Sequence, residues 1–184
     1  MTLGLTLFLG WLCLSWLHCL RPDAALKTKW LVLLIVLPLT IYPFVYGSVW
    51  WLRGLTGDLS IISTVWLGLA MYHIMTSQCL FAQGERKLLT WAVAGVGLVF
   101  YPLTLGMGNM DPYVWGYANG YMLAAVLGLS LFAFVRGYVV LASMLMLSVL
   151  AWIMGLLQSN NLWDYLLDPF IFFLALARCL RCKA

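Results

Sequence analysis

Four aspartates, one arginine and one histidine are the residues of this 184-residue chain best suited to chemistry. Carboxylates can bind a divalent cation or a cationic headgroup, and an arginine beside them can bind an anionic group. A histidine inside an apolar segment is a candidate for proton transfer or ligand binding. The candidate catalytic residues are Asp58, Asp111, Asp164, Asp168, Arg53 and His73.

Aromatic residues accompany these carboxylates in the sequence. Their rings can hold an apolar or sugar portion of a ligand, which predicts a shallow acidic-aromatic pocket. In the alternative interpretation, Trp and Tyr anchor the chain at a membrane interface and the aspartates cap helices. Asp111 and Asp168 each precede a proline, which is a favoured first helical residue. Both interpretations stay open. The aromatic residues are Trp50, Trp51, Tyr113, Trp115, Tyr117, Trp163 and Tyr165.

One histidine and four cysteines form a possible metal set near the expected cytoplasmic face. Cys179 and Cys182 have the C-x-x-C spacing that suits zinc or redox chemistry. A second C-x-x-C pair is missing from the sequence, and cysteine is also common in buried apolar helices. We therefore expect no metal site and no cofactor. The set consists of His18, Cys19, Cys79, Cys179 and Cys182.

The composition indicates what must position these residues. Hydrophobic residues make up 65% of the chain and charged residues 9%, whereas about a quarter of a soluble domain is charged. A membrane-spanning helix needs about 20 apolar residues. Apolar stretches occupy 1–20, 28–52, 59–82, 87–107, 112–135, 137–158 and 169–180. The sequence therefore predicts an all-α integral membrane protein: one domain over 1–184, with six long transmembrane helices and a short seventh.

The positive charges predict the orientation of this bundle. Nine of the ten Lys and Arg residues lie in alternate gaps between the apolar stretches, at the stretch ends that border these gaps, or in the C-terminal tail; Arg53 is the exception. Lys and Arg are retained in short cytoplasmic loops, so we expect the N-terminus outside and the C-terminus in the cytoplasm. The short loops favour the bacterial inner membrane as the location. No basic run with interleaved aromatics occurs, so we expect no nucleic-acid partner.

Small residues follow one another at intervals of four in the 112–135 stretch: Gly116, Gly120, Ala124 and Gly128. Such a stripe lets another helix backbone approach closely. We expect it to pack within the chain, with self-association or contact with another membrane protein as the alternative.

A short polar segment precedes the last apolar stretch. It is too polar to span a membrane, but its leucines repeat at helical spacing beside Trp163 and Tyr165. This pattern predicts a helix at 161–167 lying on the outer membrane interface.

His73 is the fifteenth residue of the 59–82 stretch, a little past its middle. It shares a stripe of small and polar residues with Ser63, Ala70 and Ser77. We expect this stripe to face the interior of the bundle, with His73 hydrogen-bonded to a neighbouring helix.

The predicted function is that of a small multi-pass membrane protein, either an accessory or assembly subunit or a carrier of lipids or small molecules. Its expected partners are membrane lipids and another membrane protein. The alternative is a membrane-embedded enzyme acting on a lipid-linked or headgroup substrate at the extracytoplasmic face. No nucleotide-binding or hydrolase motif occurs in the sequence.

We predict that a reporter fused after Ala184 is active only in its cytoplasmic form, because three cations precede it closely in the C-terminal tail. A reporter placed before Met1 should report the outside. Paired reporters that are active in the cytoplasm and in the exterior compartment measure this directly. A C-terminus on the outside would contradict the orientation.

Overall fold

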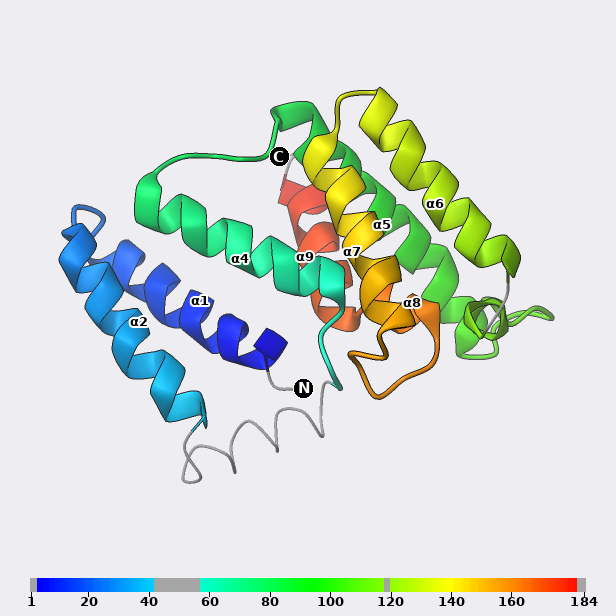
Figure 1. The fold of residues 1–184 in the computed structure, drawn as a ribbon, viewed down its shortest axis with the longest axis horizontal. Helices are drawn as coiled ribbons and strands as arrows, with labels where there is room; N and C mark the ends of the chain where they lie inside the picture. Colours follow the sequence, from blue (N-terminus) through cyan, green and yellow to red (C-terminus); the bar gives the residue numbers. More distant parts are fainter. Residues whose placement is uncertain (1–2, 42–56, 118–119, 182–184) are drawn as a thin grey trace. The chain divides into compact units, whose positions relative to one another are not determined.

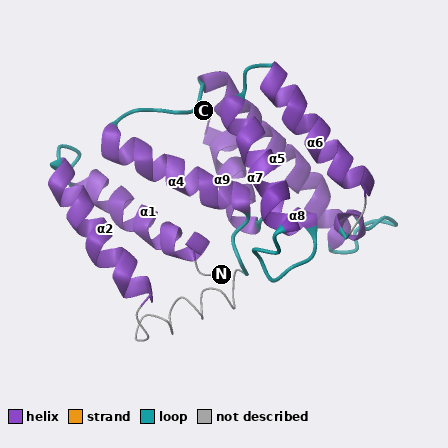
Figure 2. Cartoon of the chain, in the orientation of Figure 1, coloured by secondary structure: helices purple, strands orange, loops and turns teal. Residues whose placement is uncertain are grey.

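The computed structural model describes residues 3–41, 57–117 and 120–181. These residues form helices and loops without β-strands, which confirms the expected all-α class (Figure 2). The helices are α1 (Leu3–Leu20), α2 (Leu26–Ile41), α4 (Ile61–Thr76), α5 (Gln83–Thr104), the 3-10 helix η1 (Pro112–Gly116), α6 (Gly120–Val135), α7 (Val139–Ile153), α8 (Leu162–Leu166) and α9 (Pro169–Arg181).

The chain divides into two compact units. The first contains residues 1–59 and 64–80, and the second contains residues 60–63 and 81–184. We describe each unit by itself. The single domain expected over 1–184 is not tested by this division and stays a prediction.

The first unit is built on the hairpin of α1 and α2, which lie side by side (Figure 1). Its buried core contains Leu14 of α1, Leu33 of α2 and Met71 of α4. Gly10 lets α1 approach the side chains of Leu33 and Met71, because a β-carbon there would come within 3.3 Å of the Met71 methyl group. These contacts hold the three helices together.

A buried lysine closes the end of α4 in the first unit. Lys29 is only 7% exposed, and its ammonium group donates a 2.8 Å hydrogen bond to the carbonyl of Ile74. Ile74 lies in the last turn of α4, where backbone carbonyls have no partner within the helix and the helix dipole is negative. The positive charge therefore satisfies this helix end.

The second unit contains two helix pairs, α6 with α7 and α5 with α9 (Figure 1). Gly97 permits the close packing of α5 on α9, because a β-carbon at this position would overlap the ring of Phe172. In contrast, α5 and α6 make few or no direct contacts with each other.

Glu85 ties α5 to α7. Its side chain is 2% exposed, and its carboxylate accepts a 2.6 Å hydrogen bond from the backbone N–H of Leu141. Leu141 lies in the first turn of α7, which starts with unpaired N–H groups and the positive end of its dipole. A carboxylate from another helix thus caps α7. This residue is not among those that the sequence singled out.

The apolar stretch 112–135 does not form the single helix that we expected. Asp111 instead caps the 3-10 helix η1 by accepting a 3.0 Å hydrogen bond from the N–H of Tyr113. Tyr117 then has extended backbone geometry and forms an isolated bridge with Asn161, and α6 begins only at Gly120. The side-chain cap and the bridge compete locally with an α-helix, so the prediction of one continuous helix is wrong.

This break divides the stripe of small residues. Gly116 lies in η1, where a β-carbon would overlap the side chain of Asn161. Gly120, Ala124 and Gly128 are exposed on α6, and a β-carbon at either glycine would meet open space. The expected packing within the chain is therefore not found on α6. A partner helix on these three residues stays a prediction.

Several helices are shorter than the apolar stretches that contain them. Among the described residues, only Gln83–Thr104 is long and apolar enough to cross a membrane by length and composition. Shorter apolar helices occupy Gly4–Leu20, Ile61–Thr76, Gly120–Val135 and Val139–Ile153. Residues with positive φ follow two of these helices. Gly137, with φ +79°, follows the end of α6, and its N–H bonds to the Phe134 carbonyl; Ser77, with φ 58°, follows the end of α4.

We predict that Gly97→Val destabilises the second unit by about 3 kcal/mol, because the added methyl groups force α5 away from α9. Gly95→Val is the matched control, since a β-carbon at Gly95 meets nothing within 4 Å. Denaturant unfolding in detergent micelles measures both variants. Equal stability of the two variants would contradict the packing at Gly97.

Candidate functional site

Asp168 lies where the first residues of two helices meet in the second unit. It is 4% exposed. One carboxylate oxygen accepts a 2.9 Å hydrogen bond from the N–H of Ile171 in α9, and the other accepts a 2.7 Å bond from the N–H of Ser60, next to α4. The Ser60 hydroxyl accepts a 3.1 Å bond from the N–H of Ser63. Asp168 therefore caps α9, as its position before Pro169 suggested, and also fixes the start of α4.

Asp111 and Asp164 meet at Tyr113. The Tyr113 hydroxyl donates a 2.8 Å hydrogen bond to Asp164, while Asp111 accepts from the Tyr113 backbone. Burial raises the pKa of the Tyr113 phenol above its usual value, and its hydrogen bonds to Asp164 and Tyr117 raise it further. A raised pKa keeps the phenol protonated at neutral pH, so it continues to donate to Asp164.

Asn161 joins η1 to α8, and it is not one of the candidate catalytic residues predicted from the sequence. Its side chain is fully buried, donates a 2.8 Å hydrogen bond to the Tyr113 carbonyl and accepts a 2.9 Å bond from the N–H of Trp163. The Trp163 indole donates a 2.9 Å bond to the Pro112 carbonyl. The signal in the sequence is the N-cap pattern, an asparagine directly before a run with helical spacing.

The predicted helix at 161–167 is present as α8, but its apolar side chains pack inward. Leu162, Tyr165 and Leu166 are buried within the second unit. The Tyr165 hydroxyl lies 3.1 Å from the N–H of Leu157 and 3.1 Å from the carbonyl of Ser159. These buried side chains contribute to the packing of the second unit. The expected position of this helix on a membrane interface is not tested and stays a prediction.

The remaining candidates lie outside the second unit or outside the described residues. Arg53 lies outside the described residues, and Asp58 and His73 belong to the first unit. His73 is exposed in the last turn of α4, and its Nδ1 lies 3.1 Å from the carbonyl of Gln78. Its expected place in mid-helix, facing the interior, is wrong because α4 ends at Thr76.

The possible metal set is not assembled in the described part of the chain. No three His, Cys, Asp or Glu side chains there could jointly hold a metal ion. Cys19 and Cys79 are exposed in the first unit, whereas Cys179 is buried in the second. Cys182 lies outside the described residues.

An apolar cavity of about 570 Å³ lies in the second unit. It occupies the space between α5 and α6, with α7 behind it and α8 at one end. Its lining carries no Asp, Glu, Lys, Arg or His side chain. Representative lining residues are Ala92 and Val96 of α5, Ala125 and Leu129 of α6, Leu145 of α7 and Trp163.

The two ends of the cavity differ in chemistry. Trp115, Tyr121 and Trp163 line the end near the carboxylate network. Phe132 and Tyr138 line the other end, where α6 turns into α7. The Phe100 and Trp163 rings, 4.5 Å apart, hold the first end against α5. This volume falls within the usual range for ligand sites, and its walls suit an apolar chain.

We predict that Asp168→Ala lowers the free energy of unfolding by about 2–4 kcal/mol, because it leaves two backbone N–H groups unpaired. Asp111→Ala is the control and should cost about 1 kcal/mol, because Asp111 is exposed and accepts a backbone hydrogen bond only from Tyr113. Thermal unfolding in detergent compares the two. If Asp168→Ala were as stable as the native chain, the double cap would not be a stabilising contact.

Comparison with other proteins adds no assignment. No protein-family model matches the chain, no curated protein matches it significantly, and no solved structure does so either. The functional conclusion therefore depends on the geometry of the second unit: an apolar cavity beside a carboxylate network that serves as helix caps.

Proposed function

We propose that this chain is a multi-pass membrane protein that binds a lipid acyl chain, without catalysis, in the cavity of its second unit. The single observation that carries this proposal is the cavity of about 570 Å³ with its apolar walls. Because no Asp, Glu, Lys, Arg or His side chain lines it to take part in a reaction, such a site contributes binding by burial of apolar surface. This is the lipid-carrier form of the function expected from the sequence.

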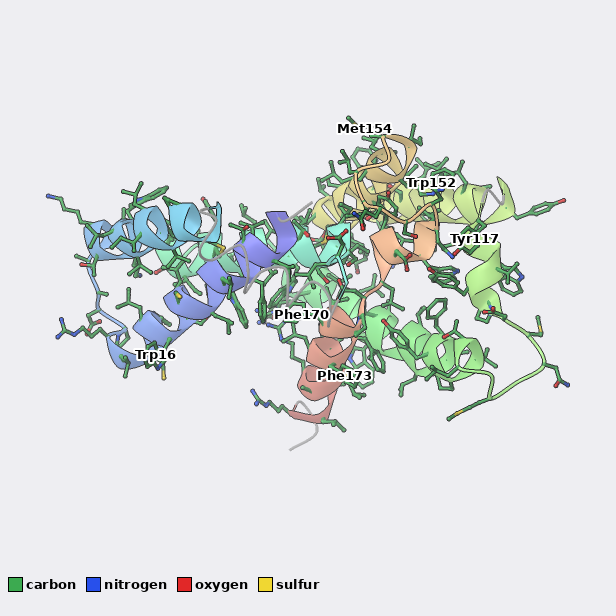
Figure 3. All side chains as sticks on the ribbon, turned by 90° about the horizontal axis from the view of Figure 1, so that it is seen from below. Trp16, Tyr117, Trp152, Met154, Phe170 and Phe173 are labelled. Atoms are coloured by element: carbon green, nitrogen blue, oxygen red, sulfur yellow. The ribbon has the colours of Figure 1, made fainter. Side chains whose placement is uncertain are left out.

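The exposed surface of α6 supports a membrane setting. Leu131, Phe134 and Val135 are all exposed, Val135 to 74%. Trp16 of the first unit and Phe173 of α9 are likewise exposed, and Figure 3 shows their side chains directed outward. Large contiguous apolar surface is unfavourable in water but matches lipid tails.

Charge sorting within the second unit supports the orientation. Arg86 lies in the first turn of α5, and Arg178 lies in the last turn of α9, which packs against α5. Asp164 and Asp168 mark the opposite ends of these helices, beside the aromatic network. We assign the basic end to the cytoplasm and the acidic-aromatic end to the outside.

The helix lengths are compatible with this placement. With its 22 residues, α5 is about 33 Å long, enough for a hydrocarbon core of about 30 Å. The 15 residues of α7 extend about 22 Å and require local thinning of the bilayer or polar flanks that reach the interface. We therefore propose that α5 determines the depth at which the second unit lies in the bilayer.

The size of the cavity suits an acyl chain. Its lining on α6 runs from Tyr121 to Ala133, about 18 Å along the helix. One leaflet contributes half of the hydrocarbon core, about 15 Å. A single acyl chain entering from one leaflet would therefore extend along most of the groove.

The carboxylates give the enzyme alternative less support. Asp111 and Asp168 accept hydrogen bonds from backbone N–H groups, and Asp164 accepts from a phenol. Groups committed to holding helix ends cannot also take up protons during a reaction without weakening the fold. The non-catalytic function is therefore the better supported of the two.

We predict that Ala125→Trp abolishes photo-crosslinking to a diazirine-labelled fatty acyl phospholipid, because the indole fills the cavity. Ala124→Trp is the matched control: Ala124 is the neighbouring residue on α6, is exposed and does not line the cavity. Mass spectrometry of the crosslinked peptides locates the label. Equal labelling of both variants, or labelling only outside α5, α6 and α7, would rule out the cavity as the binding site.

A further inference from the structure

We infer that the lipid held in the cavity is an anionic phospholipid of the cytoplasmic leaflet, with its phosphate on Arg136. This inference rests on the proposed acyl-chain site. It specifies that the headgroup is anionic, that the lipid comes from the cytoplasmic leaflet, and that Arg136 selects it.

Arg136 continues the line of α6 residues that form the cavity wall. Ala125, Leu129 and Phe132 line the cavity at helical spacings of four and three, and Arg136 follows after four more residues. The N–H of Arg136 donates a 3.0 Å hydrogen bond to the Phe132 carbonyl, so the helical register extends to this residue. Its side chain therefore projects from the same side of α6 as the wall.

The guanidinium group is held at the cavity rim by an aromatic ring. It lies 5.7 Å from the centroid of Phe132, within the range of a cation–π contact. Arg136 is exposed, whereas Phe132 forms part of the cavity wall. An acyl chain bound in the cavity would thus end beside the permanent positive charge of Arg136.

A second donor stands across the turn. Gly137, with φ +79°, reverses the chain and brings Tyr138 onto the cavity wall. A β-carbon at Gly84 would lie 3.8 Å from the Tyr138 hydroxyl, which places this hydroxyl at the first turn of α5. Tyr138 thus adds a hydroxyl donor to the end of the cavity that lies next to Arg136 in the chain.

The other charged groups near the cavity do not oppose the binding of an anionic headgroup at Arg136. Glu85 is the carboxylate at this end, and it is buried against the N-terminus of α7, bonded to Leu141. Its negative charge therefore interacts with the positive end of the α7 dipole. The opposite end of the cavity adjoins Asp164 through Trp163 and Tyr113, and a carboxylate there disfavours a phosphate. Charge complementarity fixes the headgroup at the Arg136 end.

The experiment measures lipid preference in nanodiscs that contain equal amounts of phosphatidylcholine and phosphatidylglycerol with identical acyl chains. Diazirine-labelled forms of each lipid compete for the cavity in the intact protein. We expect the native chain to favour phosphatidylglycerol about fivefold, the effect of about one charge contact. Arg136→Gln should lose this preference but still crosslink through its acyl chain. Lys87→Gln, which removes an exposed cation of α5 outside the cavity wall, should keep it.

The outcomes separate the inference from the proposed function. If the native chain shows no preference while Ala125→Trp still blocks labelling, the acyl-chain site stands and the anionic headgroup is wrong. If Lys87→Gln and Arg136→Gln lose the preference equally, general surface charge replaces Arg136 as the cause, and the inference fails. If Ala125→Trp leaves labelling unchanged, the cavity is not the site and both proposals fail.

Discussion

The unpaired backbone groups at helix ends are the constraint on which the rest of this structure depends. A chain with 9% charged residues has few polar side chains to satisfy them, and apolar surroundings supply none. Three buried charges meet this need: Lys29 at the end of α4, Glu85 at the start of α7 and Asp168 at the start of α9. Each sign matches the helix dipole, so each charge is stabilised where it would otherwise be costly.

These caps also determine where the second unit is filled and where it is hollow. Glu85 holds the start of α5 near the start of α7, and Gly97 brings α5 onto Phe172 of α9. Because α5 packs on α9 and α6 packs on α7, no side chain of the described residues fills the space between α5 and α6. The proposed binding site is thus a consequence of how the helices are paired.

Part of this arrangement was predictable from local patterns. The all-helical class and the cap at Asp168 before Pro169 were expected and are confirmed. The continuous helix over 112–135 was not found, because the side chain of Asp111 and the pairing of Tyr117 with Asn161 replace helical bonds. This competition depends on Asn161, which lies over 40 residues after Tyr117 in the sequence. A hydropathy profile therefore does not reveal it.

The sequence by itself determined the apolar composition, the helical class and the alternation of positive charge, because these depend on residue type and short-range spacing. Only the tertiary structure decided that Asp164 accepts a hydrogen bond from the Tyr113 hydroxyl and that Asp168 accepts a second bond from the N–H of Ser60. It also decided that Phe132, whose ring contacts the guanidinium group of Arg136, lines an apolar cavity. The physical reason is that the partner of a buried group and the emptiness of a space are set by residues from several helices at once.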